Sequence, residues 1–153
     1  MINYFVLGYQ GFDYFKKNFD KSKYPNTTTR IIDNGNQNIE GFQLYQLDKN
    51  IGCSGGFNLI CYIGFQYLGL EKIIIGQEDT IPEESELQEL LDKCDENKIV
   101  GLLHPFFELA TFAFHRRTFI KVGMFDENCI DGYCEDADYK QRCLLNDIKI
   151  EHL

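Results

Sequence analysis

Acidic side chains occur at three points of the chain where an apolar run ends or a helix is expected to begin. Asp33 follows the apolar pair 31–32, Glu78 and Asp79 follow the run 73–75, and a third acidic group stands at 135–138. Carboxylate oxygens can hold a divalent cation, and a carboxylate can also take a proton from an attacking hydroxyl group as a general base. These residues therefore allow metal-assisted transfer chemistry if the fold brings them together.

A glycine-rich segment, Asn-Ile-Gly-Cys-Ser-Gly-Gly-Phe-Asn at 50–58, lies between the first two acidic points. A turn of this kind that leads into a helix presents backbone N–H groups, which can bind a phosphate. A single glycine-rich motif is weak evidence, because the same residues also make an ordinary helix start with an Asn or Ser cap.

Each acidic group also has a purely structural interpretation. Asp33 precedes the turn dipeptide 34–35, so it can simply end a strand. The segment 78–80 can cap the helix that Pro82 is expected to open, and the acidic pair 135–136 can complement a helix dipole. The three histidines, at positions 104, 115 and 152, have no mutual spacing and are treated as ordinary.

Short apolar runs alternate with segments of helical period, which predicts the α/β class with a mainly parallel sheet flanked by helices. No repeat or linker divides the chain, so we expect one domain over 1–153. Strands are expected at 3–8, 30–33, 42–47, 72–76, 98–103, 111–115 and 148–150, and helices at 12–19, 55–68, 82–94 and 135–145.

Composition and charge exclude several classes of function. A net charge of −9 leaves no broad basic surface for a nucleic acid polymer. The longest apolar region, 99–114, is interrupted by His104, Pro105 and Glu108, so no transmembrane segment is expected. Six cysteines without a Cys-x-x-Cys pair argue against zinc and predict reduced thiols in a soluble cytoplasmic protein.

Taken together and in order, five segments resemble the nucleotide-sugar-dependent glycosyltransferases of the GT-A fold. The resemblance is strongest to the inverting family-2 group that includes rhamnosyltransferase-like enzymes. The matching segments are Ile-Ile-Asp-Asn-Gly at 31–35, the glycine-rich segment 50–58, the apolar run and acidic residues at 73–80, Phe-His-Arg-Arg through Phe-Asp-Glu at 114–127, and Glu-Asp-Ala-Asp at 135–138.

The resemblance implies a sugar transferred with inversion from a UDP- or dTDP-sugar to a glycan or other hydroxyl acceptor, assisted by Mn²⁺ or Mg²⁺. Asp33 would contact the base, and its carboxylate can accept the imide N3–H of uracil or thymine, a donor that cytosine lacks. The residues implied are Asp136 as catalytic base; Gly8, Tyr9, Asp33, Asn50, Gly52, Gly55 and Asn58 on the donor nucleotide; Asp79 and Glu78 on the metal; and Arg116, Arg117 and Glu135 on the acceptor side.

Two departures from the family pattern keep other functions open. Gln77, Glu78 and Asp79 stand where the group often has Asp-x-Asp, and His152 comes too early to be the family's further metal-binding histidine. We therefore expect either a minimal enzyme or one domain of a longer protein. The alternatives are a non-catalytic nucleotide-sugar-binding domain and an assembly module with the same fold.

Overall fold

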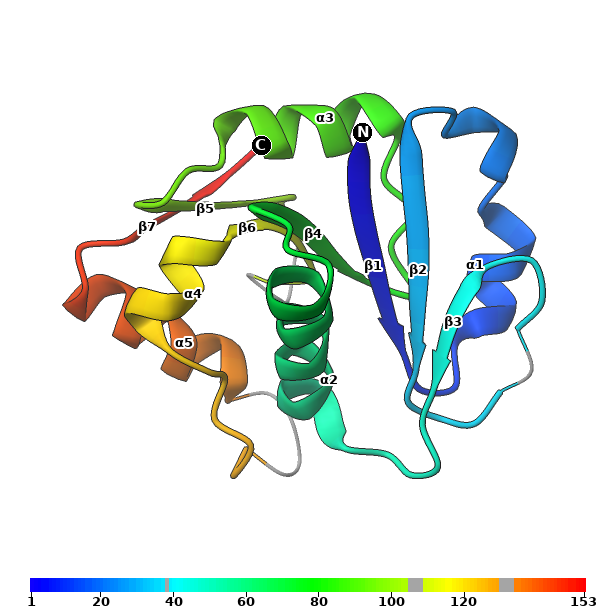
Figure 1. Ribbon diagram of the computed structural model, residues 1–153, viewed down its shortest axis with the longest axis horizontal. Helices are drawn as coiled ribbons and strands as arrows, with labels where there is room; N and C mark the ends of the chain where they lie inside the picture. Colours follow the sequence, from blue (N-terminus) through cyan, green and yellow to red (C-terminus); the bar gives the residue numbers. More distant parts are fainter. Residues whose placement is uncertain (38, 105–108, 130–133) are drawn as a thin grey trace.

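The computed structural model describes residues 1–37, 39–104, 109–129 and 134–153. They form a seven-stranded sheet in the order β3-β2-β1-β4-β6-β5-β7, flanked by helices (Figure 1). The pairs β1–β2, β1–β4, β2–β3 and β5–β7 are parallel, whereas β6 is antiparallel to both of its neighbours. The predicted α/β class with a mainly parallel sheet is confirmed.

The element bounds agree with most of the sequence predictions. The strands are β1 (Ile2–Gly8), β2 (Thr27–Asp33), β3 (Gln43–Gln46), β4 (Lys72–Gln77), β5 (Lys98–Gly101), β6 (Thr111–His115) and β7 (Lys149–His152). The helices are α1 (Phe12–Asn18), α2 (Gly52–Cys61), α3 (Glu84–Lys93), α4 (Arg116–Val122) and α5 (Glu135–Leu145), with a 3₁₀ turn η1 (Lys21–Lys23) and a π-helical turn η2 (Tyr62–Tyr67) that continues α2.

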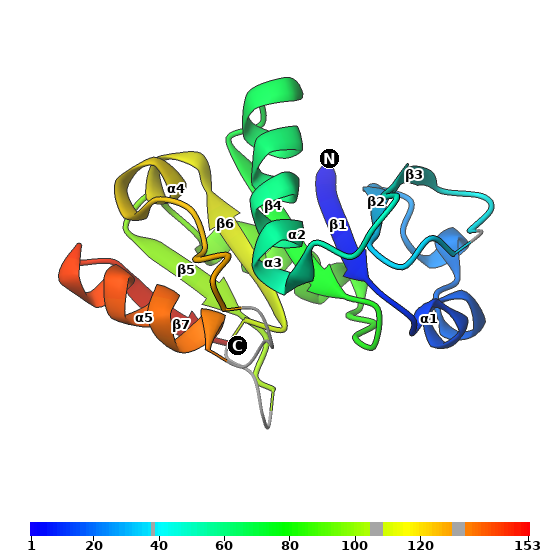
Figure 2. The ribbon, with the colours of Figure 1, turned by 90° about the horizontal axis from the view of Figure 1, so that it is seen from below.

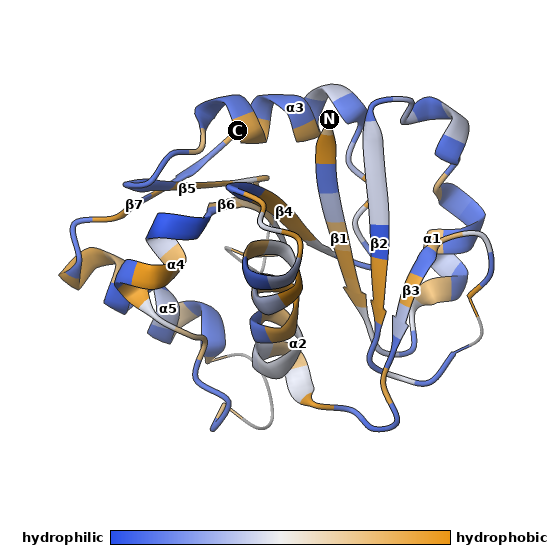
Figure 3. Cartoon of the chain, in the orientation of Figure 1, coloured by the Kyte–Doolittle hydropathy of each residue, from blue (hydrophilic) through white to orange (hydrophobic). Residues whose placement is uncertain are grey.

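The central strands β1, β4 and β6 are buried on both faces of the sheet because their side chains alternate between two hydrophobic clusters. In β4, Ile73 and Ile75 belong to the cluster beneath α2, α4 and α5, and Ile74 belongs to the cluster beneath α1 and α3. Viewed from below, α1 and α2 lie on opposite sides of the sheet (Figure 2). The colouring of Figure 3 shows β4 as apolar along most of its length, as a strand covered on both faces requires.

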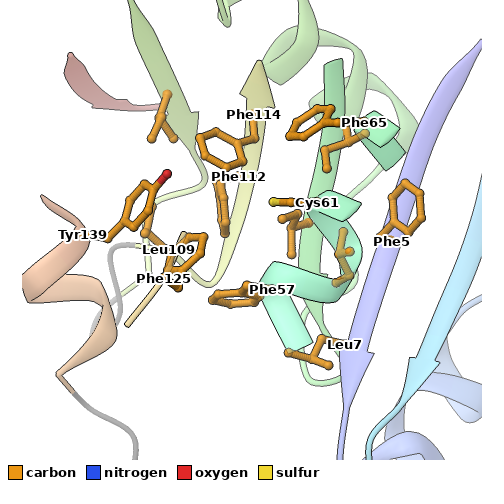
Figure 4. Packing of buried hydrophobic residues seen from close by; sticks show 14 of the residues in the cluster. Phe5, Leu7, Phe57, Cys61, Phe65, Leu109, Phe112, Phe114, Phe125 and Tyr139 are labelled. Atoms are coloured by element: carbon orange, nitrogen blue, oxygen red, sulfur yellow. The ribbon is translucent and has the colours of Figure 1, made fainter. Parts of the chain in front are cut away.

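Aromatic rings fill the cluster on the α2 side (Figure 4). Phe125 stacks on Tyr139 with ring centroids 3.9 Å apart, and Phe57 packs against Phe125 at 5.1 Å. The hydroxyl of Tyr139 donates a hydrogen bond to the carbonyl of Gly123 at 2.9 Å. These contacts fix the segment after α4 between α2 and α5, and so position the start of α5.

Strand direction decides which residues share an edge of the sheet. The parallel strands β1, β2, β3 and β4 end together, with Gly8 beside Asp33, Asp33 beside Gln46, and Leu7 beside Gln77. The carboxyl end of β6 lies at the opposite edge, because β6 runs antiparallel to β4. We use the term carboxyl edge below for the edge where β1 to β4 end.

Two sequence predictions need correction. The segment 116–122 forms helix α4, which had not been predicted because its apolar residues are too few to show a helical period. Cys129 and Cys134 form a disulfide, so the prediction of six reduced thiols is wrong for this pair; their Cα atoms lie 5.9 Å apart. The other four cysteines are free thiols.

Among the described residues, no helix is long and apolar enough to cross a membrane.

Candidate functional site

Asp33 lies at the centre of the carboxyl edge, and its carboxylate is fully buried. Its Oδ1 atom accepts a hydrogen bond from the backbone nitrogen of Gly35 at 3.0 Å, and its Oδ2 atom lies 3.5 Å from Nε2 of Gln46. The first contact is the strand-ending turn of the structural interpretation. A base can therefore reach Asp33 only if Gln46, which is exposed, moves away.

Glu78 ties the end of β4 to the loop after β1. Its Oε1 atom accepts the backbone N–H groups of Tyr9 at 3.2 Å and Gly11 at 3.1 Å. A Cβ atom at Gly8 would lie 2.7 Å from the other carboxylate oxygen, so the glycine allows this close approach. One oxygen of Glu78 is thus committed to the backbone, which leaves Asp79 as the main candidate for a metal ligand.

Asp79 is exposed and makes no hydrogen bond or ion pair with the residues that the structure describes. It does not cap α3, which begins at Glu84 with Glu83 as its capping residue. The carboxylate of Glu86 accepts the backbone N–H of Glu83 at 2.7 Å in a capping box. The capping role considered for Asp79 and Thr80 is therefore wrong, and Asp79 stays available to a ligand.

Asn34 holds the glycine-rich turn in place, a role that the sequence analysis did not assign to it. Its Nδ2 atom donates to Oδ1 of Asn50 at 2.8 Å and to the carbonyl of Gly52 at 3.1 Å, and its Oδ1 atom accepts the backbone N–H of Ile51 at 2.8 Å. The side chain is 4% exposed. An Asn in a turn dipeptide gives no sequence signal for such long-range contacts.

The glycine-rich segment contributes backbone shape more than side chains. Gly52 begins α2 with φ of +76°, a conformation that favours glycine. Gly55 lies within α2, where a Cβ atom would come 3.2 Å from Ile51. Asn58 is used within the protein: it exchanges hydrogen bonds with the backbone of Phe125 and donates to Glu127 at 2.8 Å. Its amide thus joins α2 to the segment after α4.

Acidic residues near Cys53, in the first turn of α2, change the pKa of its thiol. Burial raises the pKa of its thiol, and the negative charges of Glu135 and Asp136 raise that pKa further, with a smaller effect from Glu78. Electrostatic influence of this kind requires proximity. The packing agrees with this: Phe57 of α2 lies on Phe125, which stacks on Tyr139 of α5, and Gly56 of α2 lies against Leu7 at the end of β1.

Glu135 and Asp136 stand in the first turn of α5, where the helix dipole favours negative charge. Glu135 is 8% exposed, and its Oε2 atom has no hydrogen-bond partner among the described residues. Asp136 is partly exposed, and its Oδ2 atom accepts the backbone N–H of Leu109 at 3.3 Å. A carboxylate oriented in this way can face a ligand held between α2 and α5.

Arg116 and Arg117 are not at this site. They begin α4 directly after β6, at the opposite edge of the sheet, where the backbone nitrogen of Arg116 donates to Glu71 at 2.8 Å. Arg117 pairs with Glu96, which raises the pKa of the guanidinium. The antiparallel direction of β6, which the sequence does not reveal, removes both residues from the predicted acceptor side.

The described residues contain no group of three or more His, Cys, Asp or Glu side chains arranged to hold a metal ion. A divalent cation would therefore need oxygen ligands from outside the protein in addition to Asp79. Mg²⁺ is commonly bound in this way, by one or two carboxylates together with substrate phosphates and water. Asp79 is therefore suited to a divalent cation that is also coordinated by the oxygen atoms of a diphosphate.

Comparison with known proteins identifies the fold. No protein-family model matches the chain, and no curated protein sequence matches it. Solved structures do match it, and among them are two of the galactosyltransferase LgtC: one in complex with donor and acceptor sugar analogs, and one of its active-site mutant Q189E. Each is 12% identical and covers 99% of this chain; they are covered over 73% and 72% of their own length, with TM-scores of 0.55 and 0.57.

At this identity the similarity shows the fold alone: the chain has the GT-A fold of the glycosyltransferases. Both structures are of a galactosyltransferase, so they do not support the narrower rhamnosyltransferase-like group that the sequence motifs resemble.

Proposed function

We propose that this chain is a glycosyltransferase that moves a sugar from a nucleotide-diphosphate donor to an acceptor hydroxyl group. The observation that carries the proposal is that, within a GT-A fold, the start of α2 lies near Glu78 at the end of β4 and near the carboxylates of Glu135 and Asp136 in α5. The fold alone does not establish an activity. Residues of different elements that meet at the ends of parallel strands are typical of a ligand site.

The donor side of the proposed site is formed by the loop after β1, the turn after β2 and the end of β4. The ring of Tyr9 is 44% exposed there, while its backbone is held by Glu78. We propose a UDP- or dTDP-sugar as donor, with Asp33 accepting the imide N3–H once Gln46 releases it. Asp33 otherwise acts by fixing the turn that supports the nucleotide.

Asp79 would hold Mn²⁺ or Mg²⁺ together with the diphosphate. A divalent cation bound there would stabilise the charge that develops on the diphosphate as the glycosidic bond breaks. Glu78 supports the site by holding the loop after β1 in shape.

Asp136 is the proposed general base. It would accept the proton of the acceptor hydroxyl group as the oxygen attacks the anomeric carbon, which gives inversion at that carbon. The contact with the backbone N–H of Leu109 orients the carboxylate. Glu135 lies beside it and is placed on the acceptor side.

The test begins with thermal unfolding in the presence of nucleotides, because a ligand that binds the folded state alone raises the melting temperature. UDP or dTDP with Mn²⁺ is expected to raise it, and CMP is not. A donor-hydrolysis and transfer assay with and without Mn²⁺ follows. Binding with turnover supports the transferase, and absence of any shift at millimolar nucleotide plus metal contradicts it.

One observation favours a second candidate, a non-catalytic nucleotide-sugar-binding domain. With Glu78 committed to backbone N–H groups, Asp79 is the remaining carboxylate of the acidic motif. The same assays separate the two functions, since nucleotide binding without hydrolysis or transfer under any metal condition would identify the binding domain.

A further inference from the structure

A cavity of about 480 Å³ opens at the N-terminus of α2, beside the turn after β2 whose Asn34 holds Asn50 and Gly52. Its lining comprises Lys49, Asn50, Ile51, Gly52, Ser54, Glu127 and Cys129. Asn50 and Gly52, which the sequence motif places on the donor nucleotide, are part of this lining, whereas Asp33, Glu78 and Asp79 are not. The cavity lies instead between the glycine-rich turn and the segment that leads to α5 and Asp136.

Three features of this cavity attract an anion. The ten-residue helix α2 starts there: Oδ1 of Asn50 accepts the N–H of Gly52 at 2.8 Å, and the next N–H groups, those of Cys53 and Ser54, remain for a ligand at the positive end of the helix dipole. Ser54 is 3% exposed, and its Oγ atom has no hydrogen-bond partner among the described residues. Lys49 is exposed and forms no ion pair within the described part of the chain.

The unpartnered hydroxyl of Ser54 is the informative feature, because a buried polar group without a hydrogen bond costs free energy. A ligand oxygen would satisfy this hydroxyl and the first N–H groups of α2 together. Among the described residues of the lining, Glu127 is the one carboxylate, and its Oε1 atom is already held by Asn58. An anion would therefore bind toward Lys49 and Ser54, away from Glu127.

We propose that this cavity binds a phosphate-class oxyanion carried by the acceptor, and that Lys49 and Ser54 select such acceptors. The assignment to the acceptor rests on the proposed function, in which Asp33 and Asp79 hold the nucleotide and the metal. It also rests on Glu127 and Cys129, which place part of the lining on the segment that leads to Asp136. The volume fits a small ligand, since binding pockets commonly measure about 300–1,000 Å³.

The experiment uses inorganic phosphate as the probe and follows the backbone amide resonances of Cys53 and Ser54 by NMR. Phosphate is expected to shift both resonances and to saturate. Ser54→Ala and Lys49→Ala should each weaken phosphate binding about tenfold. The first variant loses the hydrogen bond from the Ser54 hydroxyl to phosphate, and the second loses the charge-assisted hydrogen bond from Lys49. Lys17→Ala is the matched control, because it removes the same charge from exposed α1 on the opposite side of the sheet and should leave binding unchanged.

Saturating UDP with Mn²⁺ then separates the two sources of an oxyanion. Phosphate affinity that is unchanged by UDP assigns the cavity to the acceptor. If UDP displaces phosphate and Lys49→Ala weakens UDP binding, the cavity holds the donor diphosphate and the assignment is overturned. If UDP does not bind while phosphate still does, the proposed function fails and the oxyanion site stands.

Absence of the amide shifts, or phosphate affinity that neither substitution changes, overturns the site itself. Removal of an unpartnered hydroxyl should not impair folding, and thermal unfolding of Ser54→Ala checks this. Lys49→Glu, at an exposed position, provides a second variant that should abolish phosphate binding through charge repulsion.

Discussion

The carboxylate of Glu78 lies 3.2 Å from the backbone nitrogen of Tyr9, and this contact joins two loops that are 69 residues apart in the sequence. The same oxygen also accepts the N–H group of Gly11. The two adjacent acidic residues thus differ in environment: the carboxylate of Glu78 is hydrogen-bonded to the loop after β1, and that of Asp79 is exposed to solvent. This difference separates a supporting role from a ligand role.

Glu78 should tolerate Gln much better than Ala. Glu78→Gln keeps an oxygen that can accept both N–H groups, whereas Glu78→Ala leaves them without a protein acceptor and should lower the free energy of unfolding by about 1–3 kcal/mol. Chemical denaturation measures the difference. The same variant also tests for a metal role. If nucleotide binding by Glu78→Gln no longer depends on Mn²⁺, Glu78 is a metal ligand.

Asp79→Asn should weaken UDP binding in the presence of Mn²⁺ by about tenfold or more, equivalent to roughly 1.4 kcal/mol. Binding measured without metal should change little, and stability should be retained, because the side chain is exposed and caps no helix. Titration calorimetry with and without Mn²⁺ gives both values.

The matched control for Asp79 is Glu86→Ala, which removes the capping box of α3. It should lower stability by about 0.5–1 kcal/mol and leave nucleotide and metal binding intact. An Asp79→Asn variant that behaves like this control would exclude Asp79 from the metal site.

The sequence predicts the strands and the edge of the sheet well, because buried runs and helical periods are local patterns. It does not predict strand direction, and the antiparallel β6 moves Arg116 to the opposite edge. It also does not show which polar side chains are used internally. Asp33 and Asn58 match donor-binding motifs. Yet Oδ2 of Asp33 lies beside Gln46 of the next strand, and the amide of Asn58 is held by Phe125 and Glu127, which only the folded chain brings near.

Substitution of Asn34 tests whether the glycine-rich turn must be held in place for nucleotide binding. Asn34→Ala removes three hydrogen bonds that hold the segment 50–52, and should lower stability by about 1–3 kcal/mol and weaken nucleotide binding as well. Asn18→Ala, which removes a single exposed contact in α1, is the control and should do neither. Nucleotide affinity unchanged in Asn34→Ala would show that the glycine-rich turn does not contribute to binding.

The thiol of Cys53 tests the proximity of α5 to α2. Burial and then the charges of Glu135 and Asp136 raise the pKa of this thiol, so the reactive thiolate should be scarce at neutral pH. Replacing a neighbouring carboxylate by an amide removes negative charge and lowers the pKa, so Glu135→Gln should alkylate faster at any given pH below the pKa. Cys53 is the free cysteine that is not buried, which makes iodoacetamide labelling followed by mass spectrometry specific for it.

Glu89→Gln on α3 is the control for that measurement, because Glu89 pairs with Lys93 far from Cys53. It should leave the labelling rate at the wild-type value. Equal rates in wild type, Glu135→Gln and Asp136→Asn would contradict the arrangement in which α5 faces the start of α2.

Asp136→Asn tests the proposed chemistry most directly. The substitution keeps the shape of the side chain and a polar group in the first turn of α5. It loses only the favourable interaction of one charge with the helix dipole, about 0.3–1 kcal/mol, so folding should be preserved. It removes the carboxylate that would accept the proton of the acceptor. Transfer should therefore fall by about two or more orders of magnitude, while donor affinity changes little.

Steady-state transfer and donor titration on the same Asp136→Asn variant separate the possible roles. Retained transfer would exclude Asp136 as the base, and lost donor binding would move it to the nucleotide or the metal. NMR of the first product formed by the wild-type enzyme reports the configuration at the anomeric carbon. Inversion is expected if one carboxylate acts as base in a single displacement, and a product that keeps the donor configuration would contradict the role proposed for Asp136 even if the variant is inactive.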